Sequence, residues 1–127
     1  MDWFNSLHIS LLNKSLDGLW AREQAISNNI ANVDTPNYKS YTVSFEEELK
    51  AALDRGKSKT ETVQKIQSAD IKVKQNHNLT MRLDGNNVDL ETEQIEMART
   101  QLNYLYSLRQ ISDEFARLRH VISEGRR

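Results

Sequence analysis

The sequence predicts a mainly α-helical chain in which long N- and C-terminal helices pack antiparallel as a coiled-coil-like pair. Two observations lead to this fold class. Apolar residues recur at steps of three and four near both ends of the 127-residue chain, and only four glycines and one proline interrupt them. The content of 38% apolar and 28% charged residues is typical of long solvated helices. We therefore expect an N-terminal helix at 1–33, a small middle segment of irregular structure, short helix or short strands at 34–88, and a C-terminal helix at 89–127.

The N-terminal helix is predicted from an apolar seam that Glu23 interrupts once. Gly18 lies within it and costs up to ~1 kcal/mol of helix propensity relative to Ala. The helix is expected to end near Asn32, because Pro36 drives the residue before it out of the helical region. A tight turn should follow over 35–38. The seam consists of Ile9, Leu12, Leu16, Leu19, Ile26, Ile30 and Val33.

The middle segment begins with two overlapping signals. Apolar and polar residues alternate from Tyr41 to Phe45, as in a strand. Residues 44–47 also resemble a helix capping box, and Gly56 is a natural stop. We favour a short helix over Phe45–Arg55.

The rest of the middle segment is less determined. Residues 57–65 are polar and predict a mobile loop. Residues 71–74 alternate again and predict a strand, and Asp-Gly-Asn-Asn at 84–87 predicts a turn. Beyond these signals the fold of residues 57–83 stays open.

The C-terminal helix carries the longer seam, and Asp89 is its predicted N-cap. The seam consists of Met97, Tyr104, Leu108, Ile111, Phe115, Leu118 and Ile122. In the first half of the helix the apolar stripe is widened, so that more than one neighbour could pack there. The widening residues are Ile95, Ala98, Leu102 and Leu105.

A middle segment of some fifty residues lets the second helix return beside the first, with both chain ends at one end of the molecule. In the register that we predict, Glu23 faces Leu108, about one turn from Tyr104 and Ser112. A carboxylate in an apolar seam is costly unless it is hydrogen-bonded, and both of those hydroxyls can donate.

Composition and motifs argue against an enzyme. The net charge is −1, so no nucleic-acid partner is indicated, and there is no cysteine to form a disulfide or a thiolate metal site. The three histidines are scattered, and no glycine-rich phosphate loop or nucleophile–base set is present. We expect no catalytic residue, metal, cofactor or small-molecule substrate. The first residues lack a basic segment and a continuous apolar run, so a cleaved secretory signal peptide is not expected.

Residues 27–39, Ser-Asn-Asn-Ile-Ala-Asn-Val-Asp-Thr-Pro-Asn-Tyr-Lys, resemble the signature of the bacterial flagellar rod and hook proteins. A second block at 81–91 is similar to the proximal rod members of that family, and the resemblance covers about two-thirds of the chain. Asn37 stands where the family usually has Gly, which is acceptable because Asn also adopts the left-handed conformation. The signature residues are Asn29, Ile30, Asn32, Thr35, Pro36, Tyr38, Asp84, Gly85, Asn86, Val88 and Asp89.

The resemblance implies a structural subunit of the flagellar basal body. The subunit would lie in the periplasm-spanning proximal rod, between the inner-membrane ring and the distal rod. Its terminal helices would pack with copies of itself, other rod proteins and the rod-to-ring adaptor into a tube around the export channel. We further expect Asn29, Asn32, Thr35 and Tyr38 to position the chain as it leaves the first helix.

The resemblance also implies delivery through the flagellar type III export apparatus without cleavage. Phe45 and Leu49 are similar to a Phe-x-x-x-apolar motif that early substrates of that apparatus carry, although an amphipathic helix explains the same spacing. The alternative function is a helical adaptor or export chaperone of the same secretion system. Such chaperones usually lack the Asn-Ile-Ala-Asn…Thr-Pro-x-Tyr block that this chain contains.

Overall fold

The computed structural model of the chain describes the backbone of residues 2–78 and 82–125, and side chains from Leu7 onward within those ranges. Met81, in the second signature block, lies outside the described residues. The elements in order are α1 (Asp2–Ala31), β1 (Tyr41–Ser44), α2 (Glu46–Arg55), α3 (Lys59–Gln67), β2 (Lys72–Gln75) and α4 (Leu90–Gly125). The prediction of a mainly α-helical fold with two long terminal helices is confirmed.

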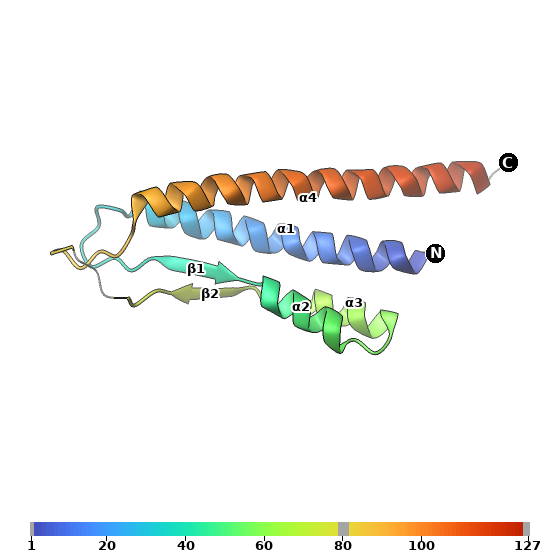
Figure 1. Cartoon of the computed structure of the whole chain (residues 1–127), viewed down its shortest axis with the longest axis horizontal. Coiled ribbons are helices and arrows are strands. Elements are labelled where there is room, and N and C mark those ends of the chain that lie inside the picture. Colours follow the sequence, from blue (N-terminus) through green and yellow to red (C-terminus); the bar gives the residue numbers. More distant parts are fainter. Residues whose placement is uncertain (1, 79–81, 126–127) are drawn as a thin grey trace.

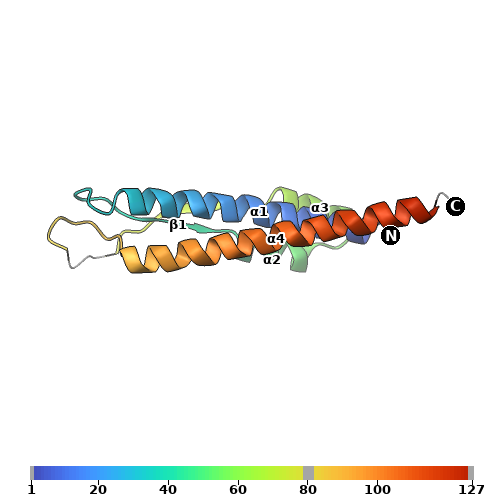
Figure 2. The same cartoon turned by 90° about the horizontal axis from the view of Figure 1, so that it is seen from above.

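The molecule is an elongated rod of three layers with α1 in the middle. α4 lies antiparallel along one side of α1, and the strands with α2 and α3 lie along the other side (Figure 1). The second view shows the same close pairing of α1 and α4 (Figure 2). The start of α1 and the end of α4 lie at the same end of the rod, as predicted. At 1.5 Å per residue, the 36-residue α4 is about 54 Å long.

The middle segment forms one unit that packs on α1. β1 and β2 pair antiparallel from Tyr41 opposite Gln75 to Ser44 opposite Lys72, and α2 and α3 connect them. A two-stranded ribbon is marginal by itself and needs a helix to pack against. Here its core continues into α1. The buried cluster consists of Leu19, Ala25, Val43, Phe45, Leu49, Ala52 and Ile66.

Two predictions for the middle segment are wrong. The loop predicted over 57–65 is largely α3, which is capped by Ser58 and anchored by the fully buried Ile66. The predicted capping box does not form, because Ser44 is still in the β1 ladder. Phe45 takes the N-cap position without a side-chain hydrogen bond. The strand and the helix that overlap in the sequence therefore both exist, one directly after the other.

The predicted pairing of α1 with α4 is wrong by one heptad. Glu23 lies beside Gln101, whose Nε2 donates to Glu23 Oε1 at 3.4 Å, and not beside Leu108. At the other end, His8 Nε2 lies 3.7 Å from Glu114 Oε1. A seam that repeats every seven residues presents the same stripe after a shift of seven, so the seam alone cannot distinguish the two registers.

Gly18 sits at the contact between α1 and the middle unit. It is buried, and a Cβ at this position would lie 2.4–2.6 Å from ring atoms of Phe45. The glycine therefore accommodates the Phe45 ring while α1 continues unbroken. Among the described residues, no helix is both long enough and apolar enough to cross a membrane.

Candidate assembly site and the polar junction beside it

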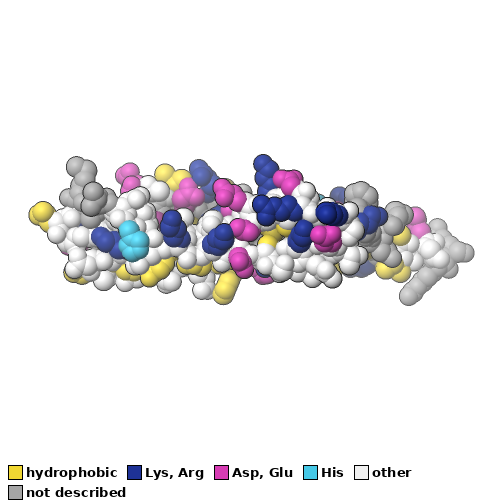
Figure 3. All heavy atoms as spheres, turned by 90° about the horizontal axis from the view of Figure 1, so that it is seen from below, with side chains coloured by type: hydrophobic (Ala, Val, Ile, Leu, Met, Phe, Trp, Pro, Cys, Tyr) yellow, Lys and Arg dark blue, Asp and Glu magenta, His cyan; other side chains and the backbone are white. Residues whose placement is uncertain are grey.

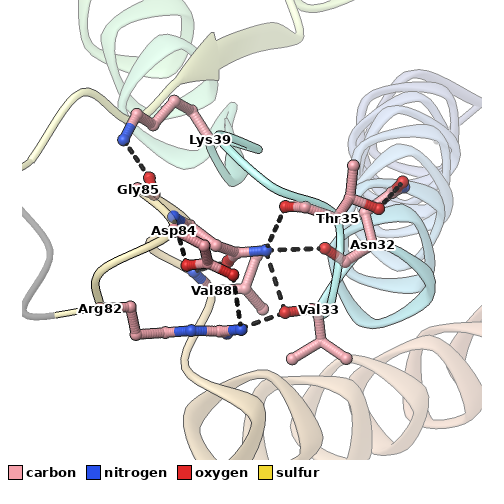
Figure 4. Close-up of polar contacts among 9 residues, drawn as sticks. Asn32, Val33, Thr35, Lys39, Arg82, Asp84, Gly85 and Val88 are labelled. Carbon is pink, nitrogen blue, oxygen red and sulfur yellow. Dashed lines mark hydrogen bonds and ion pairs between the residues drawn. The ribbon is translucent and has the colours of Figure 1, made fainter.

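The two signature blocks, far apart in the sequence, meet at the end of α1 (Figure 4). Asn86 is fully buried, and its Nδ2 donates to the carbonyl oxygens of Asn32, Val33 and Thr35, each at 2.9 Å. Its Oδ1 accepts from the backbone nitrogen of Val88 at 2.8 Å. These carbonyl groups belong to the turn that follows α1, where the regular hydrogen bonds of the helix have ended, and backbone groups near a buried side chain need partners. Asn86 therefore caps the exit of α1 from a segment more than fifty residues later.

Asn29 ties α1 to both neighbouring layers. It is fully buried, and its amide pairs with both the backbone nitrogen and the carbonyl oxygen of Tyr41, at 2.9 Å each. The same amide accepts from the Tyr38 hydroxyl at 3.2 Å and donates to Glu93 Oε2 of α4 at 3.2 Å. The side chain thus behaves like one more peptide group at the edge of β1, an edge that would otherwise be open to pairing.

Two residues with positive φ face each other, Asn37 in the turn after α1 and Gly85 in the second signature block. Asn37 has φ 62°, which confirms that Asn takes the left-handed conformation here. Its backbone nitrogen donates to the Asp84 carbonyl at 2.7 Å. Gly85 has φ 79°, and a Cβ there would lie 2.5 Å from Asn37 Oδ1. The close approach of these two segments therefore requires glycine at position 85.

Short contacts around the turn complete the junction. The Thr35 hydroxyl donates to Asn32 Oδ1 at 3.0 Å, while Pro36 is exposed. Arg82 Nη1 donates to the Val33 carbonyl at 2.8 Å, and Lys39 donates to the Gly85 carbonyl. We call the set that joins the two blocks the polar junction. It comprises Asn29, Asn32, Val33, Thr35, Asn37, Tyr38, Lys39, Tyr41, Arg82, Asp84, Gly85, Asn86, Asn87, Val88 and Glu93.

Sequence reasoning missed several members of the junction. Asn87 was assigned only to a turn, yet its Oδ1 accepts from the Ser40 nitrogen at 2.7 Å and its Nδ2 donates to the Asn76 carbonyl at 2.8 Å. Glu93, which contacts Asn29, was not among the predicted site residues. A signal was present in the run of asparagines on both sides of the middle segment, since Asn readily bonds to backbone groups.

Burial has an electrostatic cost in the junction. It raises the pKa of Glu93, and the nearby carboxylates of Glu96 and Asp89 add to the rise, while the hydrogen bond from Asn29 opposes it. Burial also raises the pKa of Tyr38, with Tyr41 and Glu93 contributing. Asp89 precedes α4, and its carboxylate accepts from the Thr92 hydroxyl at 2.9 Å. The junction therefore favours a neutral Glu93 more than water does.

The seam of α1 is mostly covered by the other layers. Leu12, Leu19 and Ile26 are buried. The remaining four seam residues are partly covered, namely Ile9, Leu16, Ile30 and Val33. The first helix therefore has little apolar surface left for another subunit along the residues of its seam.

The seam of α4 is covered much less. Ile111 is buried, and Met97, Tyr104 and Leu118 are partly covered. The other three seam residues are exposed, with Leu108 at 38%, Phe115 at 49% and Ile122 at 58%. α1 therefore covers only part of the apolar surface that α4 presents.

A second apolar run on α4 faces away from α1. Its large members are Ile95, Leu102, Leu105 and Tyr106, which are 59–68% exposed. Ile95, the exposed Ala98, Leu102 and Leu105 recur every three or four residues, and Tyr106 lies four residues after Leu102. All five share one helix face, opposite the buried Thr100 and Ile111. We call these five residues the outward stripe. Single exposed apolar residues are ordinary, whereas a run of large ones on one face indicates an interaction site.

The face made by the middle unit is different in character. Basic and acidic side chains are interspersed over it (Figure 3). Lys72 pairs with Glu48 at 2.6 Å there. The described residues hold no group of three or more His, Cys, Asp or Glu that could bind a metal ion. Phe45 and Leu49 are buried beneath this face, at 4% and 5% exposure.

Comparison of the sequence with known proteins identifies the family of the chain. Residues 21–39, which include the first signature block, match the family described as "Flagella basal body rod protein". The chain is similar to flagellar basal body rod protein FlgB of Bacillus subtilis, with 29% identity over 126 residues, 93% of this chain and 95% of the relative. It is 34% identical to FlgB of Borreliella burgdorferi over 109 residues, covering 76% of this chain and 81% of that protein. FlgB of Escherichia coli is 30% identical over 116 residues, which cover 82% and 84% of the two chains. The chain therefore belongs to the FlgB family of flagellar basal body rod proteins.

Proposed function

We propose that this chain is a structural subunit of the proximal flagellar rod and that the outward stripe of α4 is its main contact with neighbouring subunits. The single observation that carries the proposal is the exposure of this stripe on the face opposite α1. Family membership supports the location in the basal body rod. The neighbours would be copies of this chain, other rod proteins and the rod-to-ring adaptor.

The physical argument concerns apolar surface left in water. Full burial of a Leu, Ile or aromatic side chain contributes ~1.5–3 kcal/mol before ordering costs. The four large residues of the outward stripe obtain little of this in the isolated subunit, because they are more than half exposed. A neighbouring helix that covered these four side chains would supply the missing free energy of burial. The exposed seam residues Phe115 and Ile122 extend the available surface toward the end of α4.

The test is a substitution in the stripe with a matched control elsewhere. Leu102→Glu places a charge on the stripe, whereas Leu83→Glu places the same charge on an exposed leucine outside it. In purified basal bodies, Leu102→Glu should lower incorporation at least about tenfold, the factor for 1.4 kcal/mol. Leu83→Glu should leave incorporation unchanged, and both isolated variants should keep wild-type helicity. Normal incorporation of Leu102→Glu would contradict the proposal. A wild-type chain found only in the cytoplasm would favour the adaptor or chaperone function.

We also propose that the chain is delivered by the flagellar type III export apparatus and that Phe45 and Leu49 are read before the middle unit folds. Both side chains are buried in the folded subunit, so a receptor can reach them only in an unfolded chain. The experiment compares Phe45→Ala with Ile66→Ala, which opens a cavity in the same core without touching the motif. Export should fall more for Phe45→Ala. An equal loss in the two variants would show that the motif acts only through stability.

A further inference from the structure

The register of α1 against α4 is not determined by the apolar seams. Extending the observed contacts along the antiparallel pair sets Leu12 opposite Ile111 and Leu19 opposite Tyr104. Shifting α4 by one heptad sets Leu12 opposite Leu118 and Leu19 opposite Ile111. Apolar residues meet apolar residues in both arrangements. The heptad repeat therefore allows two pairings that differ by seven residues, or about 10 Å along the axis.

Polar contacts at one end of the pair distinguish the two registers. Glu93 lies one turn inside α4, and its carboxylate accepts from the buried amide of Asn29. Four residues before α4 begins, Asn86 is bound to the carbonyl groups that follow α1. A shift of one heptad would carry Glu93 away from Asn29 and bring Thr100 toward it. It would also pull on the segment that holds Asn86.

We propose that the contact between Asn29 and Glu93, supported by the Asn86 cap, selects the register of the terminal helices and thereby sets the position of the exposed α4 residues along the axis of the pair. A buried polar residue in a helix seam is known to specify register at a cost in stability. Two other polar contacts between described side chains of α1 and α4 are weaker candidates. Glu23 and Gln101 meet at 3.4 Å with Gln101 exposed. Glu114 is buried, but it lies 3.7 Å from an exposed His8 and also pairs with Arg117 of its own helix at 3.2 Å.

Crosslinking of introduced cysteines measures the register directly, because the chain contains no cysteine of its own. One full-length variant carries Glu23→Cys with Gln101→Cys, which reports the observed register. A second carries Glu23→Cys with Leu108→Cys, which reports the register shifted by one heptad. A bifunctional thiol reagent with a reach shorter than the shift is used, and the intramolecular product is quantified. In the otherwise wild-type chain the 23–101 product should exceed the 23–108 product at least about tenfold.

The decisive comparison adds Asn29→Leu and Glu93→Leu to both cysteine pairs. The 23–108 product should then rise until the two yields are within about threefold of each other. Two controls separate register from general loosening. His8→Leu with Glu114→Leu removes the polar contact at the other end and should leave the wild-type ratio unchanged. Glu93→Gln keeps an oxygen that can accept from Asn29, so it should also leave the wild-type product ratio unchanged.

Several results would overturn the inference. One is an unchanged product ratio after Asn29→Leu and Glu93→Leu. A second is an equal shift in the His8 and Glu114 control. A third is similar yields of both products, or neither product, in the wild-type background. Each outcome concerns the isolated chain and is independent of whether the outward stripe is the contact used in the rod.

Discussion

Removal of the Asn86 side chain should destabilise the subunit far more than its location in a loop suggests. Asn86→Ala deletes the donors to three carbonyl groups and the acceptor of the Val88 amide. The Val33 carbonyl retains the donor from Arg82, and the Asn32 carbonyl retains the Thr35 nitrogen. The Val88 nitrogen, next to a buried side chain, loses its acceptor, which costs ~1–3 kcal/mol.

The lost hydrogen bonds add to this cost. The two hydrogens of the Asn86 amide serve three acceptors, so we count two bonds at ~0.5–1.5 kcal/mol each. The total is about 4 kcal/mol, a large share of the ~5–15 kcal/mol that holds a typical domain together. For a chain of this length the expected fall in Tm is about 12–20 °C.

The assay is thermal and urea unfolding of the full chain, followed by circular dichroism. Asn103→Ala is the matched control, because Asn103 is exposed on α4 and its loss should change stability by less than ~0.5 kcal/mol. Asn86→Asp keeps the shape of the side chain but cannot donate, so it should be at least as harmful as Asn86→Ala. A loss below about 1 kcal/mol for Asn86→Ala would refute the cap.

Three further predictions follow from the same contacts. Gly18→Ala should destabilise by about 1–3 kcal/mol despite the better helix propensity of Ala, because the buried Phe45 ring must move; urea unfolding measures this, and a gain in stability would contradict it. Gly85→Ala should also destabilise, and the loss should be smaller in an Asn37→Gly background, where the clash is removed but the strain of positive φ stays; equal losses in a double-mutant cycle would exclude the clash. Burial raises the pKa of Glu93 in the folded state, so the folded chain holds this proton more tightly than the unfolded chain and ionisation opposes folding. Glu93→Gln should therefore raise Tm at neutral pH, and the gain should shrink as the pH falls through the ordinary carboxyl range; a gain that did not depend on pH would assign it to another cause.

Features governed by neighbouring residues could be predicted well. The long helices follow from the three- and four-residue spacing of apolar residues. α1 ends one residue before the expected Asn32. The left-handed conformation of Asn37 follows from the chemistry of its own side chain. The strand before α2 and the strand β2 follow from alternation. Each of these depends on residues within one or two turns of one another.

Features that depend on distant contacts could not be predicted. α3 has few apolar residues, and it forms because Ile66 is buried in a core shared with α1 and α2. In the sequence Gly18 only lowers helix propensity, and the structure shows that its lack of a side chain makes room for the Phe45 ring. Phe45 and Leu49 have the spacing of a Phe-x-x-x-apolar pattern in the sequence, and only the fold shows that both side chains are buried.

The heptad spacing of apolar residues was enough to predict which faces of the two long helices pair, and the length of the middle segment was enough to predict that they pair antiparallel. The sequence by itself could not determine where along the pair they meet, because a repeat of seven residues is unchanged by a shift of seven. The alignment is set by contacts between distant segments, namely those of Asn86, whose partners lie 51–54 residues earlier, and the contact of Asn29 with Glu93. These polar groups have fixed directions and must be satisfied when buried, so they accept one alignment where an apolar stripe accepts several.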